Sequence, residues 1–472
     1  MAQDIRSLSL TQLAEKIADK SVSVVECVLA SLDAIDQDGA ELNAFTSVYP
    51  ELALAQARRA DEELKADGPK SPLHGIPIAV KDLFRVEGMV RTCGSRVHVR
   101  ELCQTNAKAV QNLKDAGAIV VGLTRLNEFA YGPTGINAVD GSPRNPWNLK
   151  HACGGSSSGS ACAVASGLVW GAVGSDTGGS VRIPASNSGI AGIKPTYGRV
   201  SRQGIYPLAS SFDHAGPMAR TVADCRVMLQ AMAGYDRNDP TTWNQPPLEP
   251  VLGRPGVLNG LRIGVPRRLT FSDLHPQTAA HIEAAIAILE AAGGIVEDVE
   301  LPGAEEALEA WLVMTQAETY AVHETHLQDH YDDLSPDVAV RLTHGADVTT
   351  TDYLAARQVR QAFISTMMSV MNHFDVLLNP TTPIPAVELE TGSLMVDGIP
   401  IAGSMVLGSL TRMANLTGMP ATSLPCGLTD DGLPIGLQLT GNWFEEGKLL
   451  AIADVLEGCL DWTPGLANRF RQ

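Results

Sequence analysis

Residues 153–197 constrain the fold more than any other stretch of the chain, because Gly, Ser and Ala dominate them. Two turns in this stretch look alike: residues 154–157 read Gly-Gly-Ser-Ser, and residues 178–180 read Gly-Gly-Ser. Paired glycines allow positive φ and a close approach of the backbone to another group. We expect residues 157–166 to form a short helix and residues 168–173 an apolar strand, so that both turns face one cleft. Backbone N–H groups presented there could stabilise an oxyanion, although such small residues also serve tight packing alone.

A lysine upstream supplies the context that favours catalysis. The apolar run from Ile76 to Val80 predicts a buried strand, and Lys81 ends it. A lysine in this position either extends to solvent or stays desolvated and partly neutral. A neutral lysine can act as general base toward a serine, as in the Ser-Lys variants of the hydrolase triad.

Lys81, Ser156 and Ser180 together resemble the pattern of the amidase signature family. Four motifs carry the resemblance in the family's order: GIPIAVKD at 75–82, GGSSSGS at 154–160, GSDTGGSVRIPA at 174–185 and GIKPTYGR at 192–199. The resemblance extends from about Leu8 to a strand expected between residues 433 and 441. One departure is Ser158, where the family usually has glycine. Because one small residue replaces another there, we expect the loop to stay intact.

The resemblance implies a role for each motif residue. Ser180 matches the nucleophile that becomes acylated. Ser156 matches the bridging serine, which family members hold in a cis peptide, and Lys81 matches the base that takes the proton through Ser156. The backbone N–H groups that match the oxyanion hole belong to Thr177, Gly178, Gly179 and Ser180. Asp176 and Arg182 fall on family positions that brace the site by hydrogen bonds.

Two further segments are candidates for substrate binding. Residues 126–148 form a long, irregular stretch rich in Gly and Pro, which is typical of a functional loop. Family members run this loop past the nucleophile, so Phe129, Tyr131 and Thr134 are candidate pocket residues, with a purely structural role open for each. Residues 304–371 are mostly helical and match the segment that varies most in the family and roofs its pocket. Arg341 in this roof is a candidate clamp for a substrate carboxylate or else a surface arginine.

Two neighbouring groups of residues suggest a different general base or a different nucleophile. Asp213 and His214 could form an acid–base pair, but Lys81 already fills that role, so we expect His214 to brace the wall of the cleft. Ser157 is the centre of a match to the GxSxG nucleophile elbow. An elbow needs a strand directly before it, and residues 143–151 do not read as one, so we reject this interpretation.

Charge and cysteine content narrow the function classes. The net charge of −18 disfavours binding to nucleic acid or to an anionic membrane, and no apolar run reaches the length of a membrane helix. The eight cysteines lack zinc-ligand spacing and, without a signal peptide, predict reduced thiols in a cytoplasmic protein. His323, His326 and His330 share one helix face, for which a solvated face is favoured over a metal site. We therefore expect neither a metal nor an organic cofactor.

Strand and helix patterns alternate along the chain and predict an α/β fold. With the resemblance, this implies a single amidase signature domain over residues 1–472, with a large mixed β-sheet core covered by helices on both faces. Within it we expect N-terminal helices in residues 1–70, with Ser7 and Ser21 as N-caps. The signature core follows in residues 74–225, and the variable helical roof in residues 304–371. The resemblance leaves a homodimer open.

The sequence therefore predicts an amidase that hydrolyses the C–N bond of a small carboxamide or urea-like substrate through a Ser-cisSer-Lys triad and an acyl-enzyme. The chain also looks like hydrolases of the biuret and allophanate type, which cleave carboxylated ureas, while aryl and aliphatic amides stay equally open. The alternative is the glutaminase (A) subunit of a glutamyl-tRNA amidotransferase. In that protein an aspartate shortly before an Asn-Leu-Ala-Gly stretch holds the amino group of glutamine. Residues 405–413, which precede Asn415 here, contain no carboxylate.

Overall fold

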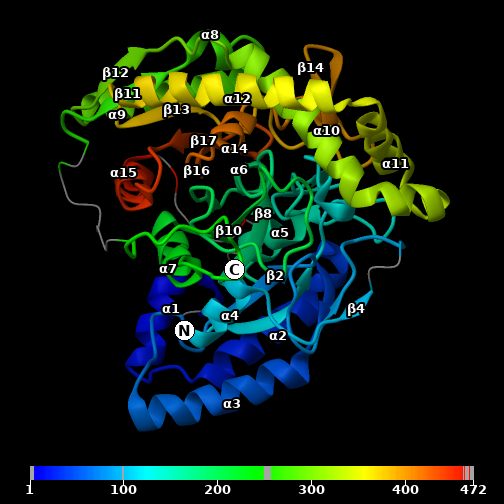
Figure 1. Ribbon diagram of the computed structural model, residues 1–472. Coiled ribbons are helices and arrows are strands. Elements are labelled where there is room, and N and C mark those ends of the chain that lie inside the picture. Colours follow the sequence, from blue (N-terminus) through cyan, green and yellow to red (C-terminus); the bar gives the residue numbers. More distant parts are fainter. Residues whose placement is uncertain are drawn as a thin grey trace.

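One large mixed sheet runs through the molecule. The computed structural model describes residues 5–97, 100–248, 256, 258–460, 462 and 467. Among these residues, eleven strands form a sheet in the order β1-β5-β2-β8-β10-β9-β16-β17-β13-β11-β12 (Figure 1). The strands are β1 Phe45–Val48, β2 Pro77–Lys81, β5 Ile119–Thr124, β8 Gly171–Asp176, β9 Ala191–Lys194, β10 His214–Ala219, β11 Arg262–Val265, β12 Ile295–Asp298, β13 Val376–Pro380, β16 Ala421–Leu428 and β17 Pro434–Thr440. Strand β2 is parallel to β5 and β8, and β11 is parallel to β12 and β13, whereas the other neighbours are antiparallel. The predicted mixed sheet is confirmed.

Helices cover both faces of this sheet, as predicted. A Cβ atom added at Gly171 of β8 would meet Met228 of α7 (Val222–Met232), whereas one added at Gly174 would meet Ser157, just before α5 (Ser158–Ala165). Residues three apart in a strand point to opposite faces, so α5 and α7 lie on opposite sides. Helix α6 (Arg182–Ser188) packs beside α5, and α15 (Glu446–Cys459) packs beside α7.

The first two of the three N-terminal helices begin two residues later than expected. The three helices are α1 Leu10–Ala18, α2 Val24–Leu42 and α3 Pro50–Asp67. The N-caps are Ser9 and Ser23, not Ser7 and Ser21. Each cap accepts a hydrogen bond from the backbone N–H three residues on, and the side chain there, Gln12 or Glu26, accepts one from the cap's own N–H. This reciprocal capping box sets where each helix starts.

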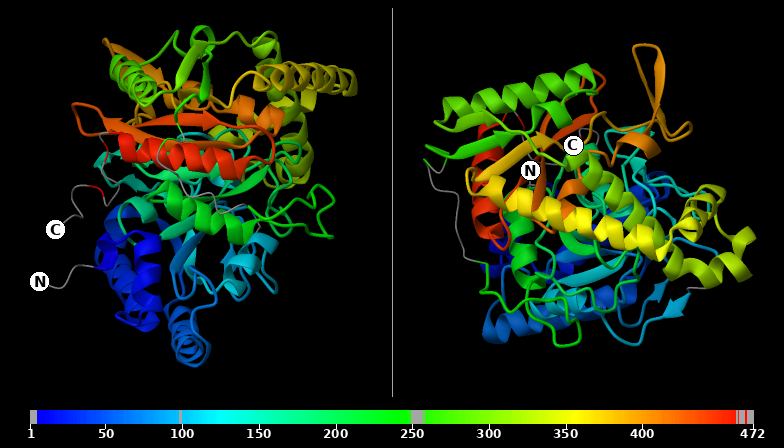
Figure 2. Two further views of the ribbon diagram at one scale, coloured as in Figure 1. Left: turned by 90° about the vertical axis from the view of Figure 1, so that its left-hand side faces the viewer. Right: turned by 45° about the horizontal axis from the view of Figure 1, so that its top comes forward.

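The helical stretch expected at residues 304–371 contains α10 Ala304–Asp329, α11 Pro336–Thr343 and α12 Thr350–Met371. Figures 1 and 2 show α10 and α12 at the end of the molecule opposite α1–α3. Helix α10 packs against α12 and against α14 (Arg412–Thr417). A buried apolar cluster that includes Trp311, Met314 and Phe363 joins these helices. None of the described helices is both long and apolar enough to cross a membrane.

Strand β8 begins three residues later than the expected strand at 168–173. The N–H groups of Leu168 and Val169 donate to Ala163 O and close the end of α5, and Trp170 N–H donates to Pro77 O. Ser175 and Asp176 therefore belong to the sheet rather than to the loop. The remaining elements are α4 Lys108–Asp115, α8 Arg267–Thr270, α9 Pro276–Ala291, α13 Gly403–Val406, β3 Val90–Arg91, β4 Glu101–Leu102, β6 Arg144–Asn145, β7 Asn148–Ala152, β14 Ser393–Val396 and β15 Ile399–Ala402.

Candidate active site

The sheet brings Lys81 to the end of β8. Strands β2 and β8 are parallel, with Ile78 opposite Gly171, so they end at the same edge of the sheet. Lys81, the last residue of β2, is fully buried. Its Nζ donates to Ser156 Oγ at 2.7 Å and to Ser175 Oγ at 2.9 Å. Of the two predicted environments for this lysine, the structure has the desolvated one.

Desolvation changes the chemistry of this amine. Burial lowers the pKa of Lys81 to about 7, although the charges of Asp176 and Asp213 act in the opposite direction. A substantial fraction of the amine is therefore neutral near pH 7. A neutral amine within hydrogen-bond distance of a hydroxyl has the protonation state and the position that a general base needs.

The two Gly-Gly-Ser turns meet in front of Lys81. Ser157 N–H donates to Ser180 O at 3.1 Å, and the Gly155–Ser156 peptide bond is cis. A Cβ atom at Gly155 would lie 2.1 Å from Asn127 Oδ1 and 2.6 Å from Gly135 N, so only glycine fits there. The loop at 126–148 thus packs directly on the first turn, as expected for a loop beside the site.

Ser180 is the most accessible serine of the two turns. Its exposed fraction is 9%, whereas Ser156 and Ser157 are 0% exposed. Strand β7, Asn148–Ala152, does precede Ser157, contrary to our expectation for residues 143–151. That strand belongs to a separate two-stranded sheet with β6, however, and the buried Ser157 Oγ donates to Ser175 O at 3.2 Å. Ser157 therefore has the contacts of a structural residue, not of an exposed elbow nucleophile.

A buried ion pair holds the second turn. Arg182 Nη2 and Nε donate to the two carboxylate oxygens of Asp176 at 2.9 and 3.0 Å, and Nη2 also donates to Asn415 Oδ1 at 2.6 Å. Asp176 in turn accepts from the N–H groups of Gly179 and Val181. Burial by itself would raise the pKa of Asp176, but Arg182 and the hydrogen bonds outweigh it and hold that pKa well below its usual range. The bracing contacts implied for Asp176 and Arg182 are present.

The residues matched to the oxyanion hole lie in this braced turn. Thr177 Oγ1 donates to Asp213 at 2.6 Å, and Thr411 Oγ1 donates to Gly178 O at 2.6 Å. The Gly179 N–H donates to Asp176 at 2.8 Å, so Asp176 occupies this donor in the present conformation. The assignment of Thr177, Gly178, Gly179 and Ser180 as oxyanion donors stays a prediction.

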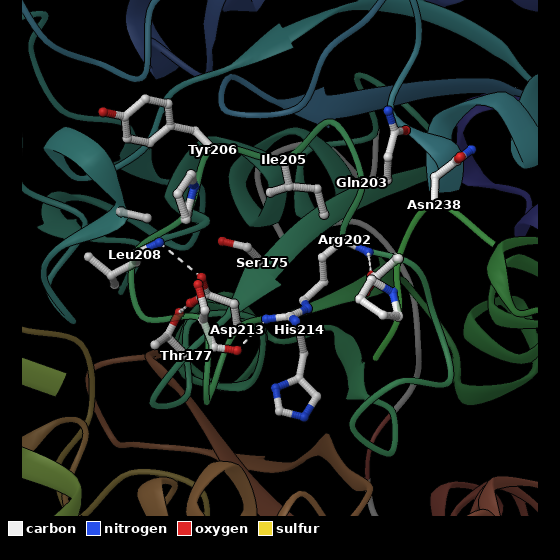
Figure 3. A pocket seen from close by; sticks show the side chains of 15 residues that line it. Ser175, Thr177, Arg202, Gln203, Ile205, Tyr206, Leu208, Asp213, His214 and Asn238 are labelled. Atoms are coloured by element: carbon white, nitrogen blue, oxygen red, sulfur yellow. Dashed lines mark hydrogen bonds between the residues drawn. The ribbon is translucent and has the colours of Figure 1, made fainter. Parts of the chain in front are cut away.

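A pocket of about 260 Å³ opens beside Ser175 and Thr177. Figure 3 shows Thr177 and Leu208 converging on the carboxylate of Asp213 in its wall. Ser180, Ser156 and Lys81 are not among its lining residues. It therefore borders the lysine side of the site rather than the nucleophile. Its lining residues are Ala130, Ser175, Thr177, Arg202, Gln203, Ile205, Tyr206, Pro207, Leu208, Ser210, Asp213, His214, Asn238, Asp239 and Pro240.

The candidate substrate-binding residues have different surroundings. Phe129 is buried against the rings of His323 and His326, with centroid distances of 4.4 and 5.5 Å, so it supports α10. Thr134 Oγ1 accepts from the N–H of Ile136 within its own turn. The guanidinium of Arg341 lies 4.9 Å from the centroid of the Tyr131 ring, and Arg341 also pairs with Asp337 at 2.6 Å. A substrate contact for any of these residues stays a prediction.

The histidines pack as structural residues. His323 is fully buried, so the expectation of a solvated face for all three roof histidines is wrong. Burial lowers the pKa of His323 to about 3, and its Nδ1 lies 3.1 Å from Nδ1 of His326, while His330 contacts Asp333. In the part of the chain that the structure describes, no three His, Cys, Asp or Glu side chains form a group that could hold a metal. His214 is buried as well, and its Nε2 lies 3.2 Å from Lys194 Nζ.

Sequence reasoning missed three residues of the site. Ser175 contacts Lys81, Asn127 N–H donates to Ser156 O of the first turn, and Arg412 lies against the second turn. Ser175 had a usable signal, because it sits at the end of a strand parallel to the lysine strand. No local signal marks Arg412, which lies more than 230 residues after Gly178 in the chain.

Comparison with known proteins identifies the family. The family model described as Amidase matches residues 26–450. The chain belongs to the amidase family. It is 38% identical to the A subunit of the glutamyl-tRNA(Gln) amidotransferase of Pseudomonas fluorescens over 96% of this chain and 98% of that protein. As a member of this family, the chain is an enzyme that acts on amide C–N bonds.

Solved structures of similar proteins share the whole fold. A chain from a study of a vestigial protein complex and an s-triazine catabolic enzyme superimposes with a TM-score of 0.91 and 33% identity, over 98% of this chain and 100% of that chain. The peptide amidase of Stenotrophomonas maltophilia superimposes with a TM-score of 0.82 and 30% identity, over 98% of each chain. The expected amidase signature fold is thus confirmed.

Proposed function

We propose that this amidase hydrolyses the C–N bond of a small carboxamide or urea-like substrate through Ser180, Ser156 and Lys81. The observation that carries the proposal is the 2.7 Å hydrogen bond between Ser156 and a buried lysine whose pKa burial lowers to about 7. Ser180, the most accessible serine of the two turns, lies in the turn that Ser157 ties to this pair. This arrangement supports nucleophilic catalysis with lysine as the base.

The reaction then has two halves. In acylation, Ser180 Oγ attacks the carbonyl carbon and its proton passes through Ser156 to neutral Lys81. The C–N bond breaks, and the leaving nitrogen takes the proton back from Lys81 through the same hydroxyl. In deacylation, a water molecule attacks the ester carbonyl by the same proton route, releasing the carboxylic acid and restoring Ser180. The backbone N–H groups of Thr177, Gly178 and Ser180 would stabilise both tetrahedral oxyanions, whereas Gly179 N–H would first have to leave Asp176.

Covalent labelling tests the nucleophile. A sulfonyl fluoride or phosphonofluoridate should modify the peptide that contains Ser180, and Ser180→Ala should remove both the label and amide hydrolysis. Ser393→Ala, at a half-buried serine of β14, is the control and should change neither. Labelling at Ser157 would contradict the assignment.

The second candidate is the glutaminase (A) subunit of a glutamyl-tRNA amidotransferase. Identity of 38% to one such protein along nearly the whole chain favours it. The absence of any carboxylate from residues 405–413 speaks against it, because a glutamine amino group would lack its expected partner. Release of ammonia should be measured with glutamine, simple amides, ureas and anilides. A strong preference for glutamine would establish this second candidate.

The proposal also specifies the substrate, the cofactors, the cellular location and the oligomeric state of the enzyme. We infer a small-molecule amide as substrate, no nucleic acid and no cofactor, since acyl transfer here uses hydroxyls, an amine and backbone N–H groups. Loss of activity with EDTA and its return with zinc would contradict this. The eight cysteines are all free thiols, which supports a cytoplasmic location. A homodimer stays a further proposal, open to measurement of the mass in solution.

A further inference from the structure

Arg412 lies beside the nucleophile turn, and no described residue provides a counter-ion for its guanidinium. It is half-buried, and among the described residues it forms neither an ion pair nor a hydrogen bond. Its guanidinium lies 4.8 Å from the centroid of the Trp311 ring. Burial lowers the pKa of Arg412, and the group that opposes this effect is the phenol of Tyr131, not a carboxylate. A partly desolvated cation without an anion is costly, so such a group is normally kept for a ligand.

Contacts place this cation at the turn that bears Ser180. A Cβ atom at Gly178 would lie 2.7 Å from Trp311 and 3.7 Å from Arg412 Cγ, so both side chains pack directly over Gly178. Arg412 follows Thr411, whose hydroxyl donates to Gly178 O and whose carbonyl accepts from Arg182. The backbone of residues 411–412 is therefore fixed to the same ion-pair network that holds the nucleophile turn.

A glycine leaves room beside the guanidinium. A Cβ atom at Gly408 would lie 3.5 Å from both Nε and Nη2 of Arg412 and 3.7 Å from Gly178 O. The two guanidinium nitrogens on this edge have the spacing that a carboxylate binds in a bidentate manner. No side chain at position 408 competes for them.

We propose that Arg412 binds a carboxylate of the substrate, so that the enzyme acts on small amides or ureas that carry a carboxylate near the scissile bond. The proposal rests on the proposed amidase function and adds the substrate class and the residue that selects it. Arg341 lies over Tyr131 on the same side but is already paired with Asp337. Of these two arginines, Arg412 is thus the one whose guanidinium has no hydrogen-bond partner among the described residues, and the Trp311 ring packs against it.

Matched pairs of amides test the substrate class. Malonamate and succinamate should be compared with malonamide and succinamide, because each pair differs only in a carboxylate or a carboxamide. The readouts are kcat/KM for ammonia release and the protection of Ser180 from sulfonyl fluoride labelling. We expect the monoamide acids to be the better substrates and the better protectants. Equal behaviour of both members of each pair in both readouts would overturn the proposal.

Arg412→Gln should reduce the preference for the acid over the diamide by roughly 10- to 150-fold, the range of one hydrogen bond to a charged group. Arg268→Gln is the matched control, since it removes the same charge from an exposed site where Arg268 pairs with Glu300. An unchanged preference in Arg412→Gln would overturn the proposal.

Substitution at position 408 gives a second, independent variant. Gly408→Asp should place a carboxylate within reach of Arg412 and lower the preference, whereas Gly408→Asn adds a side chain of the same size without charge. We expect the aspartate to lower the preference at least about 10-fold more than the asparagine, again the scale of one hydrogen bond to a charged group. Equal losses would show a steric effect and contradict the role of Arg412. If Ser180 is not labelled at all, the proposed function itself fails, whereas labelling without carboxylate preference refutes only this inference.

Discussion

Lys81 sits where its charged form is disfavoured, with hydroxyls rather than carboxylates as its direct partners. Its pKa lies near 7 in the folded protein and near 10.5 in the unfolded chain. Between these values the unfolded chain binds more protons, so the contribution of this group to stability rises with pH across that window. Below pH 7 the cost of burying the ammonium is present in full. Burial of Lys81 therefore lowers the stability of the fold near neutral pH, and the same burial makes the amine a usable base.

We expect kcat/KM to rise about tenfold per pH unit below pH 7 and to level off above it, because only neutral Lys81 accepts the proton. Lys81→Arg should lose at least about 10³-fold, since a guanidinium stays protonated in this range. A pH–rate profile from pH 5 to 9 measures both effects.

The control for this change is Lys448→Arg, at a more exposed lysine that pairs with Asp375 at 2.6 Å. Its pH profile should match that of the unchanged enzyme. If Lys81→Arg retained most of the activity, lysine would not be the base and the mechanism through Ser156 would have to be abandoned.

Gly159 in α5 and Gly458 in α15 have different surroundings. A Cβ atom at Gly159 in α5 would lie 2.2 Å from Ala44 O and 2.6 Å from Arg125 N, so the glycine lets the helix approach neighbouring backbone. At Gly458 in α15 a Cβ atom would meet nothing within 4 Å. Close packing of α5 matters for function because the helix begins directly after Ser157.

Gly159→Ala should therefore lower the free energy of unfolding by about 1–3 kcal/mol, through overpacking, and also reduce kcat. Gly458→Ala should raise it by about 0.5 kcal/mol, because alanine is the better helix former. Urea unfolding of the two variants measures these free energies, which should change in opposite directions. A Gly159→Ala protein as stable as the unchanged enzyme would mean that α5 can move without cost.

At the scale of the whole molecule, the order of strands joins distant parts of the chain. Strands β16 and β17, from the C-terminal part, lie between β9 and β13. They connect the half of the sheet that holds β2 and β8 to the half that holds β11 and β12. Because hydrogen-bonded strands run without interruption from one half of the sheet to the other, we propose that the chain is one domain.

One domain should unfold in one calorimetric transition, and a covalent label on Ser180 should shift that transition as a whole. Scanning calorimetry of free and labelled protein measures this. Two separated transitions, of which only one moved with the label, would divide the molecule at the sheet and contradict the single domain.

The family, the mixed α/β fold and the candidates Lys81, Ser156 and Ser180 were predictable from the amino-acid sequence. These conclusions rest on contiguous motifs, whose residue types and local spacing are visible in the chain. Most helices and strands were also predictable to within a few residues, because periodicity and turn residues act locally. The cap positions Ser9 and Ser23 were missed, since neighbouring serines differ only in the side chain three residues on.

The environment of each of these residues, by contrast, depends on contacts that form only in the folded protein. Lys81 is desolvated because β5 and β8 flank its strand, and its partner Ser175 is 94 positions away. His323 is buried because Phe129, from a distant loop, packs on it. Arg412 lies against Gly178, with no counter-ion in the part of the chain that the structure describes, for the same kind of reason. Burial and hydrogen-bond partners depend on residues far apart in the chain, and these contacts set the pKa of a base and the free hydrogen-bonding capacity of a cation.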